Sequence, residues 1–259
     1  MLRAAVHGWK AGGMSINNYL ADLSFVGTSY HGSQIQKNAL TVQEVFQNAL
    51  QAVMGSIPEV KCCSRTDTGV HARHFYISFI SDIPCDCGKM TAALNAHLPF
   101  DIRVLEVREV PEDFHARYSA TGKRYEYLVW NGEVMDPFLI DRALHFNYPV
   151  DEKTLDETAK VFIGTHDFSS FCSSKSSVDD KTRTVFESSV AREGDLIRFR
   201  FGADGFLYNM VRIMTGALLQ VSRGKLDKND ILLYLNGKKR DNLLITVPAC
   251  GLYLTEVIY

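Results

Sequence analysis

The chain has 259 residues, 46% of them hydrophobic, and its 28 Lys and Arg against 30 Asp and Glu give a net charge of −2. This composition excludes disordered and fibrous proteins, and the length suffices for one large domain or two small ones without disulfide or metal support. No apolar run approaches the roughly 18 residues that a membrane-spanning helix requires. The near-neutral total argues against a nucleic-acid partner, because such domains are often strongly basic.

In the first half, alternating apolar residues and short apolar runs predict strands. They are expected at Tyr19–Phe25, near Val60–Cys63, and at Phe75–Ile80 and Ile102–Val110. Thr41 and Glu44 form a candidate capping box that opens an amphipathic helix ending near Met54. A second helix is expected at Lys89–Ala96, before Pro99.

The segment Arg124–Trp130 predicts another strand, and the Pro137 region that follows it is the candidate domain boundary. The elements expected after it are a helix at Thr154–Phe162, a hairpin of Thr184–Ala191 with Leu196–Phe201, a helix from Phe206 to Gly224 and a strand at Leu252–Tyr259. The pattern predicts an α+β fold of two similar lobes, each with a mainly antiparallel sheet and flanking helices. We expect a disordered or misassigned extension at 1–17, an N-terminal lobe at 18–135 and a C-terminal lobe at 136–259.

Charge is unevenly distributed along the chain. From Tyr208 to Arg240, seven basic residues stand against two acidic ones, whereas thirteen acids exceed seven bases from Glu133 to Asp195. The basic stretch indicates either a face that follows a phosphate backbone or the solvated side of helices, and by itself the second interpretation is favoured.

The cysteines and histidines do not show the spacing of a metal site. The six cysteines lack paired C-x-x-C motifs, and of the eight histidines only His71 lies in an informative motif. We therefore expect free or buried thiols, no metal and a reducing, cytoplasmic environment.

The segment Ser64–Ala72 is too polar for a buried connection between strands. It contains Arg65, Asp67, Gly69 and His71, so neighbouring hydroxyls and amides can hold a carboxylate near a cation. A turn with capping roles only is an equally good interpretation of the bare pattern. The tripeptide Asp-Thr-Gly beginning at Asp67 also occurs in aspartic proteases. Those enzymes need two apposed carboxylates, and the chain has one copy.

Six ordered blocks of sequence resemble the tRNA pseudouridine synthase A (TruA) family. The blocks are Gly27–Gln34 with Val42–Glu44, Arg65–His71, Asp113–Ala120 leading into Arg124–Tyr127, His166–Phe171, Met210–Arg212 with Gly216, and Pro248–Leu254. Together they extend from about Asn18 to Tyr259.

The resemblance implies a pseudouridine-synthase-like fold with the active-site cleft between the lobes. It implies an isomerase that converts uridine to pseudouridine in the anticodon stem-loop of tRNA, at positions 38 to 40 of the family's substrate, without a cofactor or metal. On this basis Asp67, Tyr125 and Arg212 are the expected catalytic residues, with Arg212 keeping Asp67 ionised. Tyr125 is also expected to stack on the target base and Arg65 to help displace the nucleotide, while His71 supports the loop. Family members act as homodimers.

The chain departs from the family's usual pattern at four positions. Ser33 replaces a tryptophan, Ser64 a glycine, Thr68 an alanine and Cys250 an acidic residue. We expect these changes to affect substrate range and local packing more than the reaction. The alternatives are a noncatalytic RNA-binding module of the same fold and, less favoured, a dimeric aspartic protease.

Overall fold

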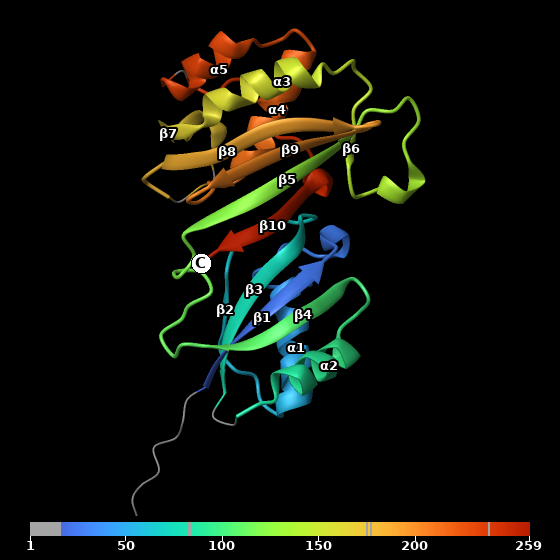
Figure 1. The fold of residues 1–259 in the computed structure, drawn as a ribbon, viewed down its shortest axis with the longest axis vertical. Coiled ribbons are helices and arrows are strands. Elements are labelled where there is room, and N and C mark those ends of the chain that lie inside the picture. The colour runs from blue at the N-terminus through green and yellow to red at the C-terminus, as the bar shows by residue number, and fades with distance from the viewer. Residues whose placement is uncertain (1–16, 82–83, 175, 177, 238) are drawn as a thin grey trace, which may run out of the picture.

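The computed structural model describes residues 17–81, 84–174, 176, 178–237 and 239–259 (Figure 1). The strands are β1 Asn17–Phe25, β2 Val60–Cys62, β3 His71–Ser81, β4 Ile102–Val110, β5 Gly122–Trp130, β6 Leu144–His145, β7 Gly164–Asp167, β8 Thr182–Glu193, β9 Leu196–Ala203 and β10 Leu252–Ile258. The α-helices are α1 Val42–Met54, α2 Cys87–His97, α3 Glu152–Ala159, α4 Met210–Ser222 and α5 Lys228–Leu235. Apart from Asn17, the extension expected at the N-terminus lies outside the described residues.

The described strands form one ten-stranded sheet with the main order β4-β1-β3-β10-β5-β9-β8-β7. Its strand pairs are antiparallel except β10 with β3 and β5 with β6. The predicted α+β class with mainly antiparallel pairing is confirmed. The strands expected to form one sheet per lobe are joined, because β10 inserts between β3 and β5 at the centre of the sheet (Figure 1).

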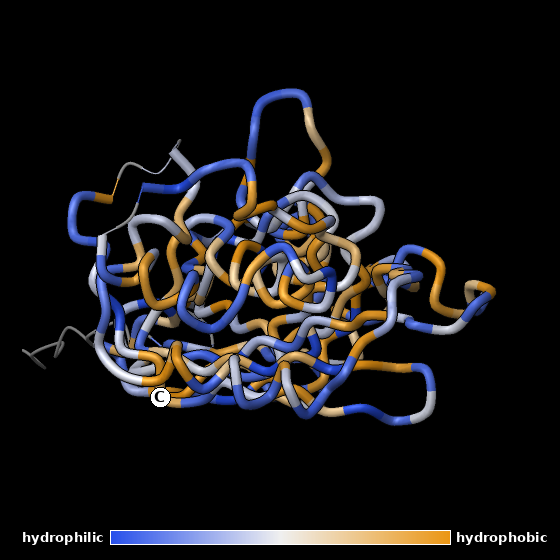
Figure 2. Tube along the Cα trace, turned by 90° about the horizontal axis from the view of Figure 1, so that it is seen from above, coloured by the Kyte–Doolittle hydropathy of each residue, from blue (hydrophilic) through white to orange (hydrophobic). Residues whose placement is uncertain are grey.

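Helices cover one side of the sheet (Figures 1 and 2). The apolar side of α1 is buried there through Val42, Phe46 and Leu50, as its periodicity predicts. Strand β5 shows the corresponding alternation. Tyr125 and Tyr127 join the hydrophobic core. Arg124 and Glu126 instead form ion pairs with residues of neighbouring strands. The two faces of the central strands therefore differ in chemistry, apolar toward the helices and charged on the other side.

The predicted elements are all found, with shifted ends. Strand β3 begins at His71 rather than Phe75, directly after the polar loop. Helix α4 begins at Met210 rather than Phe206, because Asn209 has a left-handed φ of 62° that the helix cannot contain. The short elements β6, β7 and α5 are not foreseen from the sequence. No helix in the described part of the chain is long and apolar enough to span a membrane.

Candidate active site

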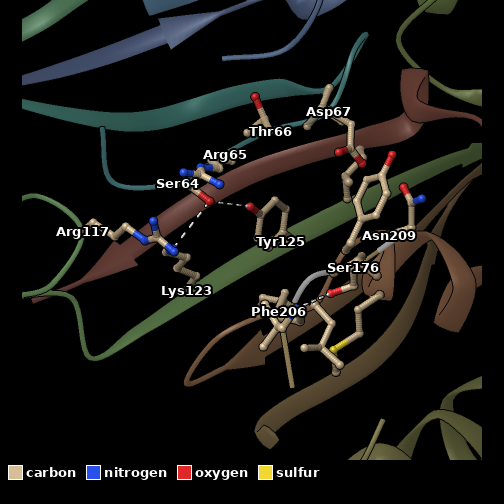
Figure 3. Close-up of a pocket in the computed structure, with 17 residues that line it drawn as sticks. Ser64, Arg65, Thr66, Asp67, Arg117, Lys123, Tyr125, Ser176, Phe206 and Asn209 are labelled. Carbon is tan, nitrogen blue, oxygen red and sulfur yellow. Dashed lines mark hydrogen bonds between the residues drawn. The ribbon is translucent and has the colours of Figure 1, made fainter. Parts of the chain in front are cut away.

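A cavity of about 390 Å³ lies where β5 and β10 meet, on the side of the sheet that carries Tyr125 (Figure 3). One wall comes from the loop of residues 64–70 and the other from the start of α4 with the residues before it. The lining residues include Ser64, Arg65, Asp67, Lys123, Tyr125, Phe206 and Asn209. The cavity thus joins segments from the first and second halves of the sequence.

Close backbone packing fixes the loop 64–70. Val70 donates its N–H to the Asp67 carbonyl at 3.2 Å, which closes a turn, and Gly69 within it has a φ of +79°. A Cβ on Gly27 would lie 1.9 Å from the Val70 carbonyl oxygen. Only glycine at position 27 permits this approach, so the Gly-rich motif preceding α1 and the Asp67 loop are two parts of one packing unit.

His71 holds the end of the loop from both ring nitrogens. Its Nδ1 accepts the Gly27 N–H at 2.9 Å, so the proton lies on Nε2, which donates to the Cys250 carbonyl at 3.0 Å. Burial lowers the pKa of His71 and favours this neutral form. The ring therefore links the Gly27 turn to the segment that precedes β10, in keeping with the supporting role expected of it.

Asp67 and Arg212 face each other across the junction of the two halves. Arg212 Nη1 lies 3.4 Å from Asp67 Oδ2. The guanidinium is fixed by two further bonds, from Nε to the Val247 carbonyl and from Nη1 to Asn209 Oδ1, both 2.8 Å. The left-handed backbone of Asn209, which asparagine tolerates better than most residues, directs its side chain to this position. Arg212 is thus oriented before any ligand arrives.

Burial raises the pKa of Asp67 above its ordinary value, although the charge and hydrogen bond of Arg212 oppose the shift. Arg212 therefore favours the ionised carboxylate, as expected, but does not fully compensate the loss of water. Asp67 is a carboxylate held in a partly desolvated cavity beside one fixed cation. Such a group gains basicity and nucleophilicity relative to an exposed aspartate.

Tyr125 forms the floor of the cavity from β5. Only 7% of the residue is exposed, and its ring meets Phe206 edge to face with centroids 5.1 Å apart. Its hydroxyl lies 3.4 Å from Ser64 Oγ. Burial raises the pKa of Tyr125 and outweighs the opposing effect of the hydrogen bond with Ser64, so the phenol is protonated at neutral pH.

The cations of the cavity come mainly from the first half of the chain. Arg65 is exposed at its rim, and Arg117 and Lys123 line it as well. From the basic stretch 208–240, Arg212 reaches Asp67. Arg240 instead donates to the Leu244 carbonyl. Sequence reasoning missed Arg117, which stands in a matched block beside residues with stronger signals, and Lys123, which directly precedes the block Arg124–Tyr127.

No group of three or more His, Cys, Asp or Glu side chains within the described ranges has the geometry of a metal site. Among the lining residues that the structure describes, Asp67 alone is acidic. A paired-carboxylate protease site is therefore not formed within this cavity.

Comparison with known proteins decides the family. The profile of the family described as tRNA pseudouridine synthase matches residues 21–119 and 158–259. The chain belongs to this family. Similar relatives named tRNA pseudouridine synthase A occur in Acetivibrio thermocellus (42% identity, covering 92% of this chain and 97% of the relative) and Thermoanaerobacter pseudethanolicus (41%, covering 94% and 100%). Another, in Staphylococcus aureus, is 38% identical and covers 92% of this chain and 90% of the relative.

Membership of the tRNA pseudouridine synthase family agrees with the resemblance found in the sequence motifs. The structure brings Asp67, Tyr125 and Arg65 to one cavity and sets Arg212 against Asp67. These four residues come from positions as far apart as 65 and 212. Residues from separate matched blocks of the sequence are therefore close together in the folded chain.

Proposed function

We propose that this protein isomerises uridine to pseudouridine in tRNA, within the anticodon arm. The observation that carries the proposal is the pairing of Asp67 with Arg212 beside Tyr125, in a cavity of about 390 Å³ that is large enough for a nucleobase with part of its sugar. The reaction breaks the N-glycosidic bond, turns the uracil and joins it again through C5. The cavity offers one carboxylate and one aromatic floor for these steps, and Arg212, paired with Asp67, supplies a fixed cation.

Asp67 is the carboxylate that starts the reaction. Ionised, it either attacks the substrate or assists the loss of the base, and Arg212 keeps it oriented during both. Tyr125 presents its ring to the base and is suited to receive the C5 proton once the new carbon–carbon bond has formed. Each role uses a group that the site has already oriented.

Arg65 stands at the rim, exposed and free to reach into RNA. A uridine in a stacked stem must leave the stack before its glycosidic bond is accessible, which costs a few kcal/mol. Arg65 is suited to occupy the space that the base vacates. Arg117, which is exposed and also lines the cavity, provides a contact to a phosphate that flanks the displaced nucleotide.

We also propose that the enzyme acts in the cytoplasm as a homodimer and contacts one tRNA with both subunits. The near-zero total charge does not oppose an RNA partner, because three of the four charged residues that line the cavity are cations. Recognition then depends on the shape of the tRNA more than on overall charge.

The test is release of tritium from C5-labelled uridine in unmodified tRNA, with wild-type protein and Asp67→Ala. We expect release with the wild type and none above background with the variant. Retained release in Asp67→Ala would remove the carboxylate from its role. Binding of tRNA by the wild type without release from any tRNA would instead favour a noncatalytic RNA-binding module.

A further inference from the structure

Three polar side chains that line the cavity, those of Lys123, Ser64 and Tyr125, form one row of contacts with Ser64 in the middle (Figure 3). Lys123 Nζ lies 3.5 Å from Ser64 Oγ, and Ser64 Oγ lies 3.4 Å from the Tyr125 hydroxyl. Lys123 and Tyr125 are two residues apart on β5, so their side chains project from the same face of the strand. Ser64 reaches the pair from the end of β2. Its hydroxyl is able to donate to one neighbour and accept from the other at the same time.

The row provides an acceptor for the phenolic proton of Tyr125, which Tyr125 by itself lacks. A protonated phenol cannot take a proton from carbon unless it gives up its own in the same step. Burial keeps the Tyr125 hydroxyl protonated, so an outlet for that proton is required. Ser64 leads along the cavity wall from Tyr125 to Lys123, and these distances are in the range that shortens when a substrate closes a site.

We propose that Ser64 and Lys123 form a proton relay that makes Tyr125 an effective base for the C5 proton. The C5 proton passes to the Tyr125 oxygen, the phenolic proton to Ser64 Oγ, and the Ser64 proton to the amine of Lys123. The electrons of the C5–H bond return to the uracil ring as the C5–C6 double bond. Lys123 ends as an ammonium and releases its proton to solvent when the product leaves. This release balances the proton that uracil N1 takes up from solvent after losing its bond to the sugar, so no oxidant or other reactant is consumed.

The surroundings of Lys123 suit an amine that accepts a proton. Burial lowers the pKa of Lys123. The nearby Cys63 side chain opposes this shift, whereas the positive charge of Arg117, which also lines the cavity, adds to it. Arg65 and Asp67 are the other charged groups of the cavity lining, and Tyr125 adds a phenol. Lys123 is therefore more readily neutral than an exposed lysine, and a neutral amine is the form that the relay needs.

This inference rests on the proposed isomerase activity, and the experiment separates the two. Single-turnover rates are measured against pH for wild type, Ser64→Ala, Lys123→Met and Lys123→Arg, with uridine and with C5-deuterated uridine in tRNA. The exposed Lys89→Met is the matched lysine control. An inactive wild type would refute the isomerase activity, whereas an active wild type with unaltered relay variants would refute the relay alone.

We expect Ser64→Ala and Lys123→Met to lower the single-turnover rate by about 10- to 100-fold, within the range of general acid–base catalysis. The deuterium isotope effect should increase in both, because proton removal from C5 becomes the slow step. Because the relay needs the neutral amine, the wild-type rate should rise with pH as Lys123 loses its proton. This rise should be absent in Lys123→Met. The double variant should be no slower than the slower single variant, since two members of one relay act as a unit. Lys89→Met should behave as wild type.

Lys123→Arg distinguishes a relay from a simple positive charge. Arginine retains charge and hydrogen-bond donors but cannot lose a proton near neutral pH. The relay predicts that it fails to restore the rate. Restoration of the rate by arginine, or a loss confined to tRNA affinity, would make Lys123 an RNA contact and overturn the proposal. Near-ultraviolet circular dichroism identifies any variant that has lost its packing, and Ser64→Gly then serves as the alternative removal of the hydroxyl.

Discussion

Ser33 and Thr66 hold each other by two reciprocal hydrogen bonds. The Thr66 N–H donates to Ser33 Oγ at 2.8 Å, and the Ser33 N–H donates to the Thr66 carbonyl at 3.2 Å. Ser33 is fully buried. A small hydroxyl residue thus fixes the backbone immediately before Asp67.

Removing this hydroxyl should loosen the loop. Ser33→Ala leaves the Thr66 N–H without its acceptor, and we expect a loss of about 1–2 kcal/mol in the free energy of unfolding. Chemical denaturation measures it, with Ser24→Ala as the control. Ser24 donates to the Ala72 carbonyl, whose loss is less costly. Equal losses in the two variants would show that Ser33 has no special part in holding the loop.

Substitution of Gly32, which packs against the backbone of Thr66, should destabilise the Asp67 loop more than Ser33→Ala does. Its φ is +85°, and a Cβ would lie 2.5 Å from the Thr66 carbonyl oxygen. Gly55 has a similar φ of +78° with no atom within 4 Å. Gly55→Ala should cost about 1–2 kcal/mol from backbone strain alone. Gly32→Ala should cost more and also reduce turnover, because the backbone of the Asp67 loop must move. Comparable stability and activity in the two variants would contradict the close packing.

Asp67→Asn should separate stability from activity. Since the folded pKa of Asp67 is raised, the folded state favours the protonated form, and its contribution to stability is lost as pH rises through that pKa. At neutral pH the neutral asparagine should therefore raise the melting temperature relative to wild type. The difference should vanish below the ordinary pKa of an aspartate. Tritium release should fall by at least about 1,000-fold in the same protein.

Arg212→Ala should abolish most turnover while largely retaining tRNA binding. The variant removes the influences that lower the pKa of Asp67, so the acidic limb of any residual pH–rate profile should move to higher pH. Gel-shift affinity and single-turnover rates measure the two effects. Reduced affinity with an unchanged rate at saturating tRNA would identify Arg212 as a phosphate contact.

Tyr125→Phe should retain the ring and lose the proton acceptor. The edge-to-face contact with Phe206 does not need the hydroxyl, so tRNA affinity should change little. Turnover should fall by about 100- to 1,000-fold. Tyr127→Phe is the matched control, because Tyr127 lies on the same face of β5 but outside the cavity lining, with its hydroxyl donating to the Pro248 carbonyl. A similar loss of turnover in both variants would indicate damage to the sheet rather than to the chemistry.

The fold class and most elements follow from local patterns, because amphipathic periodicity and turn residues report which side of each element is buried. The joining of the halves does not follow, since nothing local to Leu252–Ile258 specifies that this strand pairs with β3 and β5. The motifs predict Asp67, Tyr125 and Arg212 as site residues, and folding brings them together. Lys123 and Asn209 were missed because their contributions depend on which distant side chains they meet.

The central position of β10 has a consequence for how the protein folds. The hydrogen bond between His71 and the Cys250 carbonyl joins residues 179 positions apart. Contacts of such sequence separation form late, because loop closure opposes them until local structure is in place. Arg212 and Asp67 meet across the same junction, so this pair is also assembled late in folding. During refolding, recovered activity should lag behind the recovery of helical circular dichroism, since a chain with most of its secondary structure still lacks the pairing of Arg212 with Asp67.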